Sequence, residues 1–338
     1  MADGDPVSSP KRTLEAATPN APTVSVIICA YTTNRWDLLV DSVSSVLDQT
    51  LPPREVFVCI DHNPELYRRA QAHWRSHSRV RVIENRYGGR LGSARTTAAE
   101  LASGSLIAFL DDDAAAEPDW LRTLVAAMAD PSVVATGGAP LPIFSRPRPR
   151  WIPLECDWVF GCAYRGLPES TAPVRHVIGA SMCVRREELH AIGYFHSDDH
   201  DDMDMCHRLL HNYADRQILY VPDAVVHHYV HPERLTWSYF WRRCFSVNRG
   251  KVGAFAGMGA ARNLRAERQF VRRSLRTGVY AGFKEWGSGD VGGLWRALSL
   301  VAGIVLAAVG YGFGHVELAG RRLIGGVPLS PPSPDEKR

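Results

Sequence analysis

The stretch Ser105-Leu106-Ile107-Ala108-Phe109-Leu110-Asp111-Asp112-Asp113 decides the fold. Its apolar part has the length of a buried strand, and it ends abruptly in three carboxylates. Three adjacent acids repel one another, so we expect a cation to offset that repulsion, and oxygen ligands at this density suit Mg²⁺ or Mn²⁺. The same acids are also consistent with a solvated turn that caps the helix expected near Pro118, because acids are ordinary at helix starts.

Three further apolar runs precede this strand, and a polar loop follows each of them. They are Val24–Ala30, Glu55–Ile60 and Val80–Glu84, and segments with helical spacing separate them. Strands that alternate with helices predict an α/β protein with a mixed, mostly parallel sheet flanked by helices. Ligands of such sheets bind beyond the carboxyl ends of the strands, so we expect the loops after the four strands to share one crevice.

The third of these loops is rich in glycine and arginine. Gly88, Gly89 and Gly92 leave room for a ligand, and the helix expected after them offers free N–H groups to a phosphate. Arg95 adds positive charge to that place. A glycine turn before a helix is also common without a ligand, and Asp61 at the end of the second strand also suits an ordinary turn.

A second concentration of acids lies between His196 and Arg208, where we expect a helix to begin near Asp201. Asp202, at that start, is placed for proton abstraction if its side chain faces the crevice. Helix capping accounts for one or two of these carboxylates but hardly for all of them. A histidine and aspartate metal site of the hydrolase kind is an alternative, although the spacing matches no compact ligand helix.

Other segments complete the expected domain. Pro140–Trp158 shows no periodicity and predicts a long loop over the site, and Val177–Val184 predicts a strand with small residues at its centre. Gln217–Pro222 and Ala224–His231 predict two more short strands. A histidine at a strand end can supply a nitrogen ligand to a metal, so we expect one ligand among the three histidines of the last strand, the others being hydrogen-bonded core residues.

The C-terminal part differs in composition. Basic residues dominate from Arg234 to Arg276, which predicts an anionic partner, whereas a net charge of +3 for the whole chain does not argue for nucleic acid. Ala297–Val316 contains no charged residue and is long enough to span a membrane, although a buried or interfacial helix explains it as well. The seven cysteines form no C-x-x-C pair and indicate a reduced, cytosolic protein.

Several of these segments, in this order, resemble the family 2 glycosyltransferases, which are inverting enzymes of GT-A fold that use nucleotide-activated sugars. The resemblance covers residues 24–251. It rests on the first strand, Asp61, the loop at residues 85–95, Asp111-Asp112-Asp113 as a D-x-D motif, Gly179–Met182, and Asp201-Asp202-Met203-Asp204 followed by Arg208.

The resemblance implies a role for each matching position. The implied nucleotide-binding residues are Ala30, Tyr31, Arg35, Asp61, Arg95, Asp111 and Asp112. Those implied for the sugar or the acceptor are Gly179, Ala180, Ser181 and Met182. Asp113 would hold Mn²⁺ or Mg²⁺ with His228 or His227, and Asp202 would be the general base. The family usually has Glu-Asp where this chain has Asp201-Asp202, so Asp201 is the alternative base.

Composition and the resemblance together divide the chain. Residues 1–22 are expected to be a disordered leader without a secretory signal, and residues 23–232 a GT-A catalytic domain. A C-terminal helical appendage follows: residues 233–290 are a basic amphipathic helical extension, 291–320 an apolar helix that is membrane-associated or buried, and 321–338 a polar tail.

The expected function is therefore that of a hexosyltransferase. It would move a sugar from a nucleoside diphosphate donor, with a UDP-sugar as the first candidate, to a glycan, lipid-linked or small-molecule acceptor. We expect no nucleic-acid partner, a membrane surface as a further partner, and a cytoplasmic location at the cytosolic face of a membrane. The alternatives are a non-catalytic nucleotide-sugar-binding partner and a sugar nucleotidyltransferase, which would need a glycine-rich loop where residues 30–35 contain no glycine.

Overall fold

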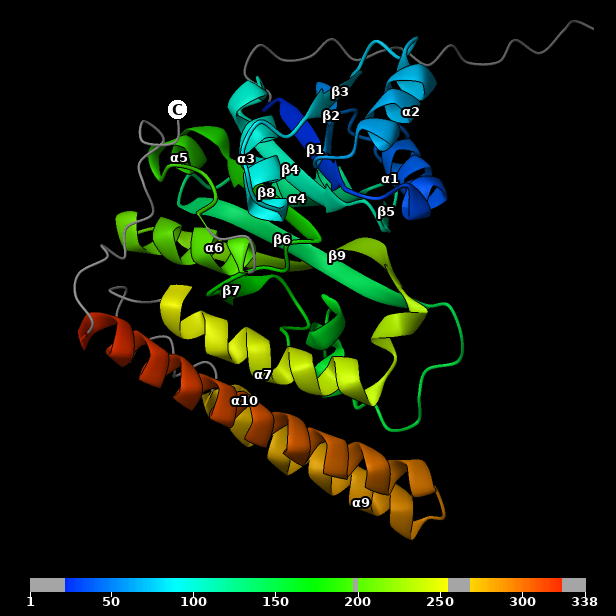
Figure 1. Ribbon diagram of the computed structural model, residues 1–338, viewed down its shortest axis with the longest axis vertical. Coiled ribbons are helices and arrows are strands. Elements are labelled where there is room, and N and C mark those ends of the chain that lie inside the picture. Colours follow the sequence, from blue (N-terminus) through cyan, green and yellow to red (C-terminus); the bar gives the residue numbers. More distant parts are fainter. Residues whose placement is uncertain (1–21, 197–199, 255–267, 324–338) are drawn as a thin grey trace, which may run out of the picture.

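One mixed sheet of nine strands organises the structure, a computed structural model that describes residues 22–196, 200–254 and 268–323 (Figure 1). The expected leader, most of the polar tail and residues 255–267 of the basic extension lie outside the described residues. Two acids of the second acidic concentration, Asp198 and Asp199, also lie outside them.

The first half of the sheet is parallel. Its strands lie in the order β3-β2-β1-β4, with the bounds β1 Val24–Ala30, β2 Glu55–Ile60, β3 Val80–Glu84 and β4 Leu106–Asp111. The connecting helices are α1 Trp36–Leu47, α2 Pro64–Trp74 and α3 Leu91–Leu101. Apolar clusters cover both faces of this half, which explains why β1, β2 and β4 are almost wholly apolar runs.

The second half of the sheet is mostly antiparallel. The order continues as β4-β8-β6-β9-β5, with β5 Ala114–Ala116, β6 Val133–Phe144, β8 Ser181–Arg185 and β9 Gln217–Val230. A short strand, β7 Ala172–Val174, pairs with β9, and the helices of this half are α4 Trp120–Ala127, α5 Arg186–Ala191 and α6 Asp201–Asn212. The predicted mixed, mostly parallel α/β sheet is confirmed for the strands around the site.

Two local predictions were wrong, and proline explains both. Residues 140–144 are not loop but the end of β6, and Leu154–Phe160 forms a 3-10 helix, η2. β6 pairs with β8 only as far as Gly137, so its prolines fall where one strand edge needs no donor. The two expected short strands at residues 217–231 are one strand, β9, whose pairing with β6 is interrupted around Pro222.

The C-terminal helical appendage is confirmed. It begins with η3 Pro232–Arg234 and α7 Trp237–Ala254. A further helix then runs through a π turn, η4 Leu275–Val279, into α9 Tyr280–Gly287, and α10 Val291–Leu323 follows. Phe240 and Cys244 of α7 pack with η2 and with Leu300 of α10 in a third apolar cluster. Figure 1 shows α7 between the sheet and α10, and α9 with α10 as the outer layer.

Candidate active site

The carboxyl ends of β1 and β2 meet in a polar group at one edge of the sheet. Asp61 follows β2, and its Oδ1 accepts hydrogen bonds from Asn85 at 2.8 Å and lies 2.6 Å from Nδ1 of His62. Tyr31 follows the buried Ala30, and the residue is 55% exposed. An exposed aromatic ring beside a hydrogen-bonded carboxylate is a suitable surface for a planar, polar ligand.

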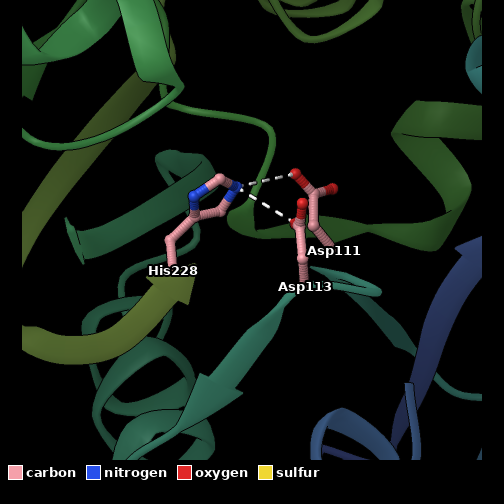
Figure 2. A group of neighbouring side chains, drawn as sticks. All are labelled: Asp111, Asp113 and His228. Carbon is pink, nitrogen blue, oxygen red and sulfur yellow. Dashed lines mark ion pairs between the residues drawn. The ribbon is translucent and has the colours of Figure 1, made fainter. Parts of the chain in front are cut away.

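The three acids of the D-x-D stretch lie at the end of β4, where they meet a histidine from β9. Ala114 of β5 pairs with His228 of β9, which brings the imidazole beside the acids. His228 Nε2 lies 3.2 Å from Oδ1 of Asp113 and 3.8 Å from Oδ2 of Asp111 (Figure 2). One ligand atom from each of the three side chains falls within 4.8 Å of the others, so these residues form a candidate metal centre.

The donor set of this centre fits a divalent cation. Two carboxylates and an imidazole supply oxygen and nitrogen ligands, a combination that suits Mn²⁺. Asp113 Oδ2 is buried and makes no hydrogen bond of normal geometry, although cationic groups surround it. Cys162 Sγ lies 3.7 Å from Nδ1 of His228 and so helps to fix the ring, which leaves Nε2 toward the acids.

The charges of this cluster are strongly coupled. Burial and the charge of Asp113 raise the pKa of Asp112 to about 7, against the opposing effect of Arg35. Burial also disfavours the charged form of Asp113, but the imidazoles of His228 and His231 beside it outweigh this effect and hold the pKa of Asp113 well below its usual range. Burial lowers the pKa of His228, but Asp111 and Asp113 outweigh that effect and hold it well above its ordinary value.

Arg35 is one of the cations that offset the repulsion between the acids. Its Nη1 lies 3.1 Å from Oδ1 of Asp112 and 3.0 Å from Oδ2 of Asp113. Its guanidinium also lies over the ring of Tyr31, 5.3 Å from the ring centroid. Arg35 therefore connects the exposed aromatic ring with the metal centre.

Arg95 connects the metal centre with the second acidic group. The side chain is buried, with Nη2 donating to Asp111 Oδ1 at 2.9 Å and to the carbonyl oxygen of Gly179 at 2.8 Å. Its Nη1 donates to Oδ2 of Asp201 at 2.6 Å. One guanidinium from α3 thus joins the end of β4 to the start of α6.

The two adjacent acids at the start of α6 have different surroundings. Asp201 is buried against Arg95, and burial raises its pKa to about 6 although Arg95 opposes that shift. Asp202 is half-buried, and its Oδ2 accepts a hydrogen bond from the backbone N–H of Gly179 at 2.8 Å. Its Oδ1 accepts from the backbone N–H of Met203 at 2.7 Å. Asp202 is therefore the more accessible of the two carboxylates.

The predicted sugar and acceptor segment forms the wall next to Asp202. A Cβ atom at Gly179 would lie 2.9 Å from Arg95 Nη1 and 3.1 Å from Asp202 Oδ2, which explains the glycine. Ala180 is buried, Ser181 accepts a hydrogen bond from Trp120 Nε1 at 2.8 Å, and Met182 lies in the core. The contacts of these four residues with a sugar or an acceptor stay predictions.

The histidine pair splits in the structure, and a third histidine joins the site. His227 is partly exposed and lies 3.1 Å from Glu117, away from the three-residue metal centre. His231 Nε2 lies 3.3 Å from Asp113 Oδ2, and Arg234 Nη2 lies 3.9 Å from the same oxygen. His231 was one of the three histidines from which a single ligand was expected, but only His228 and His227 were chosen as candidates, and Arg234 was predicted only as part of the basic segment. Strand alternation could not predict their approach to Asp113, because β9 ends at Val230.

Comparison with known proteins decides the family. The sequence profile described as "Glycosyl transferase family 2" matches residues 25–193, which is half of the chain. The chain belongs to glycosyl transferase family 2. This family 2 chain is 31% identical over 232 residues to the glucosyl-dolichyl phosphate glucuronosyltransferase of Haloferax volcanii, with 66% of this chain and 74% of that relative covered. It is accordingly a glycosyltransferase.

Solved structures agree on the GT-A fold of this family 2 enzyme. The mannosyltransferase PcManGT of Pyrobaculum calidifontis, in complex with GDP-Man and Mn²⁺, matches with a TM-score of 0.57 and 18% identity over 87% of this chain and 88% of that one. GalNAc-T7 with UDP, GalNAc and Mn²⁺ matches with a TM-score of 0.50 and 17% identity, and the match covers 63% of this chain and 44% of that one. The predicted GT-A fold and family are confirmed.

Proposed function

We propose that this chain is an inverting, metal-dependent glycosyltransferase that moves a sugar from a nucleoside diphosphate donor to an acceptor hydroxyl. The observation that carries the proposal is the bridge that Arg95 makes between Asp111, at the end of β4, and Asp201, at the start of α6. A metal-dependent, inverting sugar transfer needs acids that bind a metal and a separate carboxylate that takes a proton. The bridge supports the proposal because it ties the end of β4 to the start of α6, where Asp202 follows Asp201.

Asp202 is the proposed general base, and the geometry favours it over Asp201. A pKa of about 6 would suit Asp201 for this role, but its carboxylate is buried and bound to Arg95. Asp202 is more accessible, and each of its oxygens accepts one backbone hydrogen bond, so the remaining lone pairs can accept from an acceptor hydroxyl. Access to the hydroxyl is the first requirement for a base, before its pKa.

In the proposed reaction, Asp202 takes the proton of the acceptor hydroxyl as that oxygen attacks the anomeric carbon of the donor. The attack comes from the side opposite the leaving diphosphate, so the configuration inverts. Asp111, Asp113 and His228 would hold Mn²⁺ or Mg²⁺, which when bound offsets the negative charge that develops on the leaving group. The imidazole ligand favours Mn²⁺, since Mg²⁺ prefers oxygen ligands.

The nucleotide is proposed to lie along the ends of β1, β2 and β4. Tyr31 offers an exposed ring for stacking with the base, and Asp61 offers an acceptor that is already oriented by Asn85. Arg35 lies between that ring and the metal centre, where it adds positive charge for the diphosphate. A UDP-sugar is the first candidate donor.

The acceptor is proposed to be lipid-linked. The Haloferax volcanii relative is named for glucosyl-dolichyl phosphate, a lipid-linked sugar. The described residues of this chain also include one helix, within Val291–Gly320, that is long and apolar enough to cross a membrane by length and composition. The proposed place of action is the cytosolic face of a membrane, with residues 23–232 as the catalytic domain.

A donor and acceptor screen tests this function. Wild-type protein is incubated with UDP- and GDP-sugars and Mn²⁺, first in a thermal-shift assay and then with acceptors that carry sugar hydroxyls: short-chain polyprenyl-phosphate sugars, oligosaccharides and small glycosides. The expected result is Mn²⁺-dependent stabilisation by one donor and a product whose anomeric proton coupling shows inversion. Retention of configuration would refute the proposed mechanism. Release of pyrophosphate from a nucleoside triphosphate would indicate a nucleotidyltransferase instead, and donor binding without transfer a non-catalytic partner.

A further inference from the structure

The outer face of α10 is a continuous apolar stripe. Its exposed residues recur at intervals of three or four positions along the helix, from Trp295 through Val305 and Val309 to Phe313 and Val316. Only 33% of the apolar window of this helix is buried. Side chains at this spacing share one side of a helix, so α10 presents an apolar surface to its surroundings along most of its length.

The helix that runs into α9 adds aromatic and basic side chains to this outer layer. Tyr280, Phe283 and Trp286 of α9 are all exposed, while Gly278 and Gly282 of the same helix pack against α10. The turns before α9 carry four exposed arginines, Arg268, Arg272, Arg273 and Arg276. Arg268, Arg272, Arg276, Tyr280 and Phe283 follow one another at helical spacing, so cations and aromatic rings share one face.

We propose that the outer faces of α9 and α10, with the arginines before α9, form a docking surface for an anionic lipid bilayer, on which both helices lie in the interface rather than cross it. Aromatic rings favour the headgroup level of a bilayer, and arginines favour anionic headgroups. The proposed function gives only a membrane as the place of action, whereas this inference names the binding surface, the anionic lipid and the orientation of the helices, and it is tested without any sugar transfer.

The packing of α10 against α7 argues for the interfacial orientation. Gly303, Gly310 and Gly314 of α10 let the two helices approach closely, and Cβ atoms at the last two would strike backbone atoms of Phe245 and Arg249. If α10 crossed a bilayer with this packing intact, it would draw α7 into the hydrocarbon. α7 carries Arg242, Arg243, Arg249 and Lys251, and charges at bilayer depth are costly.

Charge complementarity favours a bilayer over a second copy of this chain. The arginines before α9 need an anionic counterpart, and the acids nearest to the outer layer are already engaged. Glu285 binds Arg296, and Glu317 binds Arg249. In a two-fold dimer the same surface patch of both copies would meet. Among the described residues, that patch contains no acid without a partner that could pair with these arginines.

Vesicle flotation with the full chain tests the proposal. The protein is mixed with sealed vesicles of phosphatidylcholine alone or with 30% phosphatidylglycerol, at about 0.1 M and about 1 M salt. We expect binding to the anionic vesicles, with at least a tenfold loss of binding in Phe283→Ser/Trp286→Ser and in Trp295→Glu/Phe313→Glu. The variant Arg272→Glu/Arg273→Glu is expected to show the same tenfold loss of vesicle binding at low salt and a smaller loss at high salt. Binding that is equal in all variants would overturn the proposal.

Matched controls separate docking from misfolding. Leu101→Glu changes an exposed apolar residue of α3, and Arg68→Glu/Arg75→Glu reverses two exposed charges near α2; both variants are expected to float like wild type. Circular dichroism melts must be unchanged in every variant that is scored. A stable dimer in solution that does not bind vesicles would overturn the proposal in favour of a second copy.

A protease test decides between lying on the bilayer and crossing it. The chain carries a C-terminal epitope tag and is bound to sealed anionic vesicles from outside, after which protease is added outside. If α10 lies in the interface, the tag stays on the outer side and is removed. Protection of the tag in intact vesicles, with loss after detergent, would show that α10 crosses the bilayer and would overturn the proposal.

Discussion

Replacing Arg95 by methionine tests whether one buried guanidinium holds the two halves of the site together. Arg95 is 3% exposed and donates to Asp201, Asp111 and the carbonyl oxygen of Gly179. Methionine fills much of the space but supplies no donor, so the buried carboxylate of Asp201 loses its cation. Removing one partner of a buried ion pair costs about 3–5 kcal/mol. With an unfolding entropy of about 2.1 cal/mol/K per residue, this predicts a melting temperature about 4–7 °C lower.

The effect has a defined pH dependence. Burial already raises the pKa of Asp201 to about 6, and the loss of Arg95 raises it further. A carboxyl whose pKa is higher in the folded than in the unfolded protein lowers the free energy of unfolding at pH values above its unfolded pKa. At lower pH the group is protonated in both states, and this cost disappears. The difference between wild type and Arg95→Met is therefore expected to be larger at pH 8 than at pH 5.

Melting curves by circular dichroism measure the effect in four proteins: wild type, Arg95→Met, Asp201→Asn and the double variant. The double variant is expected to recover about half of the loss, since a neutral amide needs no buried cation. Arg122→Met, on the exposed side of α4, is the control and is expected to change stability by less than about 0.5 kcal/mol. A loss below about 1 °C in Arg95→Met, or strict additivity in the double variant, would refute the reasoning.

Three further outcomes follow from individual side chains. His228→Ala is expected to weaken Mn²⁺ binding in calorimetric titrations at least about tenfold, whereas His227→Ala, which changes the partner of Glu117, should bind as wild type does. Gly179→Ala is expected to displace Asp202 and to lower transfer more than donor binding, whereas Gly287→Ala, with open space around the new methyl group, should be neutral. Burial lowers the pKa of His207 to about 3, so the stability that its neutral form contributes is complete above pH 6.5 and is lost as the pH falls toward 3. Between pH 7.5 and pH 5, wild type should therefore lose about 2 kcal/mol more of its free energy of unfolding than His207→Gln, as measured by urea unfolding. Equal losses would contradict the lowered pKa of His207.

The strands and the order of the acids could be predicted from the sequence because local pattern determines them. An apolar run of strand length before Asp111 predicts both the buried strand β4 and the position of the acids at its end. Helical spacing after Asp201 likewise predicts α6 and the position of its first carboxylates. These features need no information from distant parts of the chain.

Features that depend on pairing between distant segments could not be predicted. The bridge from Arg95 to Asp201 joins positions that are far apart in the chain, and nothing in the glycine-rich loop distinguishes a phosphate-binding arginine from a structural one. The approach of His231 to Asp113 depends on the turn after β9. Pro140 and Pro142 argued against a strand at the end of β6, because proline cannot donate a hydrogen bond within a sheet. Only the order of the strands shows that one edge of β6 has no neighbour there.

The central claim, that the metal-binding acids and the base are different residues of one site, is tested most directly by the variant Asp202→Asn. Single-turnover transfer and Mn²⁺-dependent donor binding are measured in this variant, with Asp113→Asn beside it. We expect Asp202→Asn to bind the donor as wild type does but to transfer at least about 100-fold more slowly, whereas Asp113→Asn is expected to lose the Mn²⁺-dependent binding. Transfer by Asp202→Asn at the wild-type rate would contradict the account.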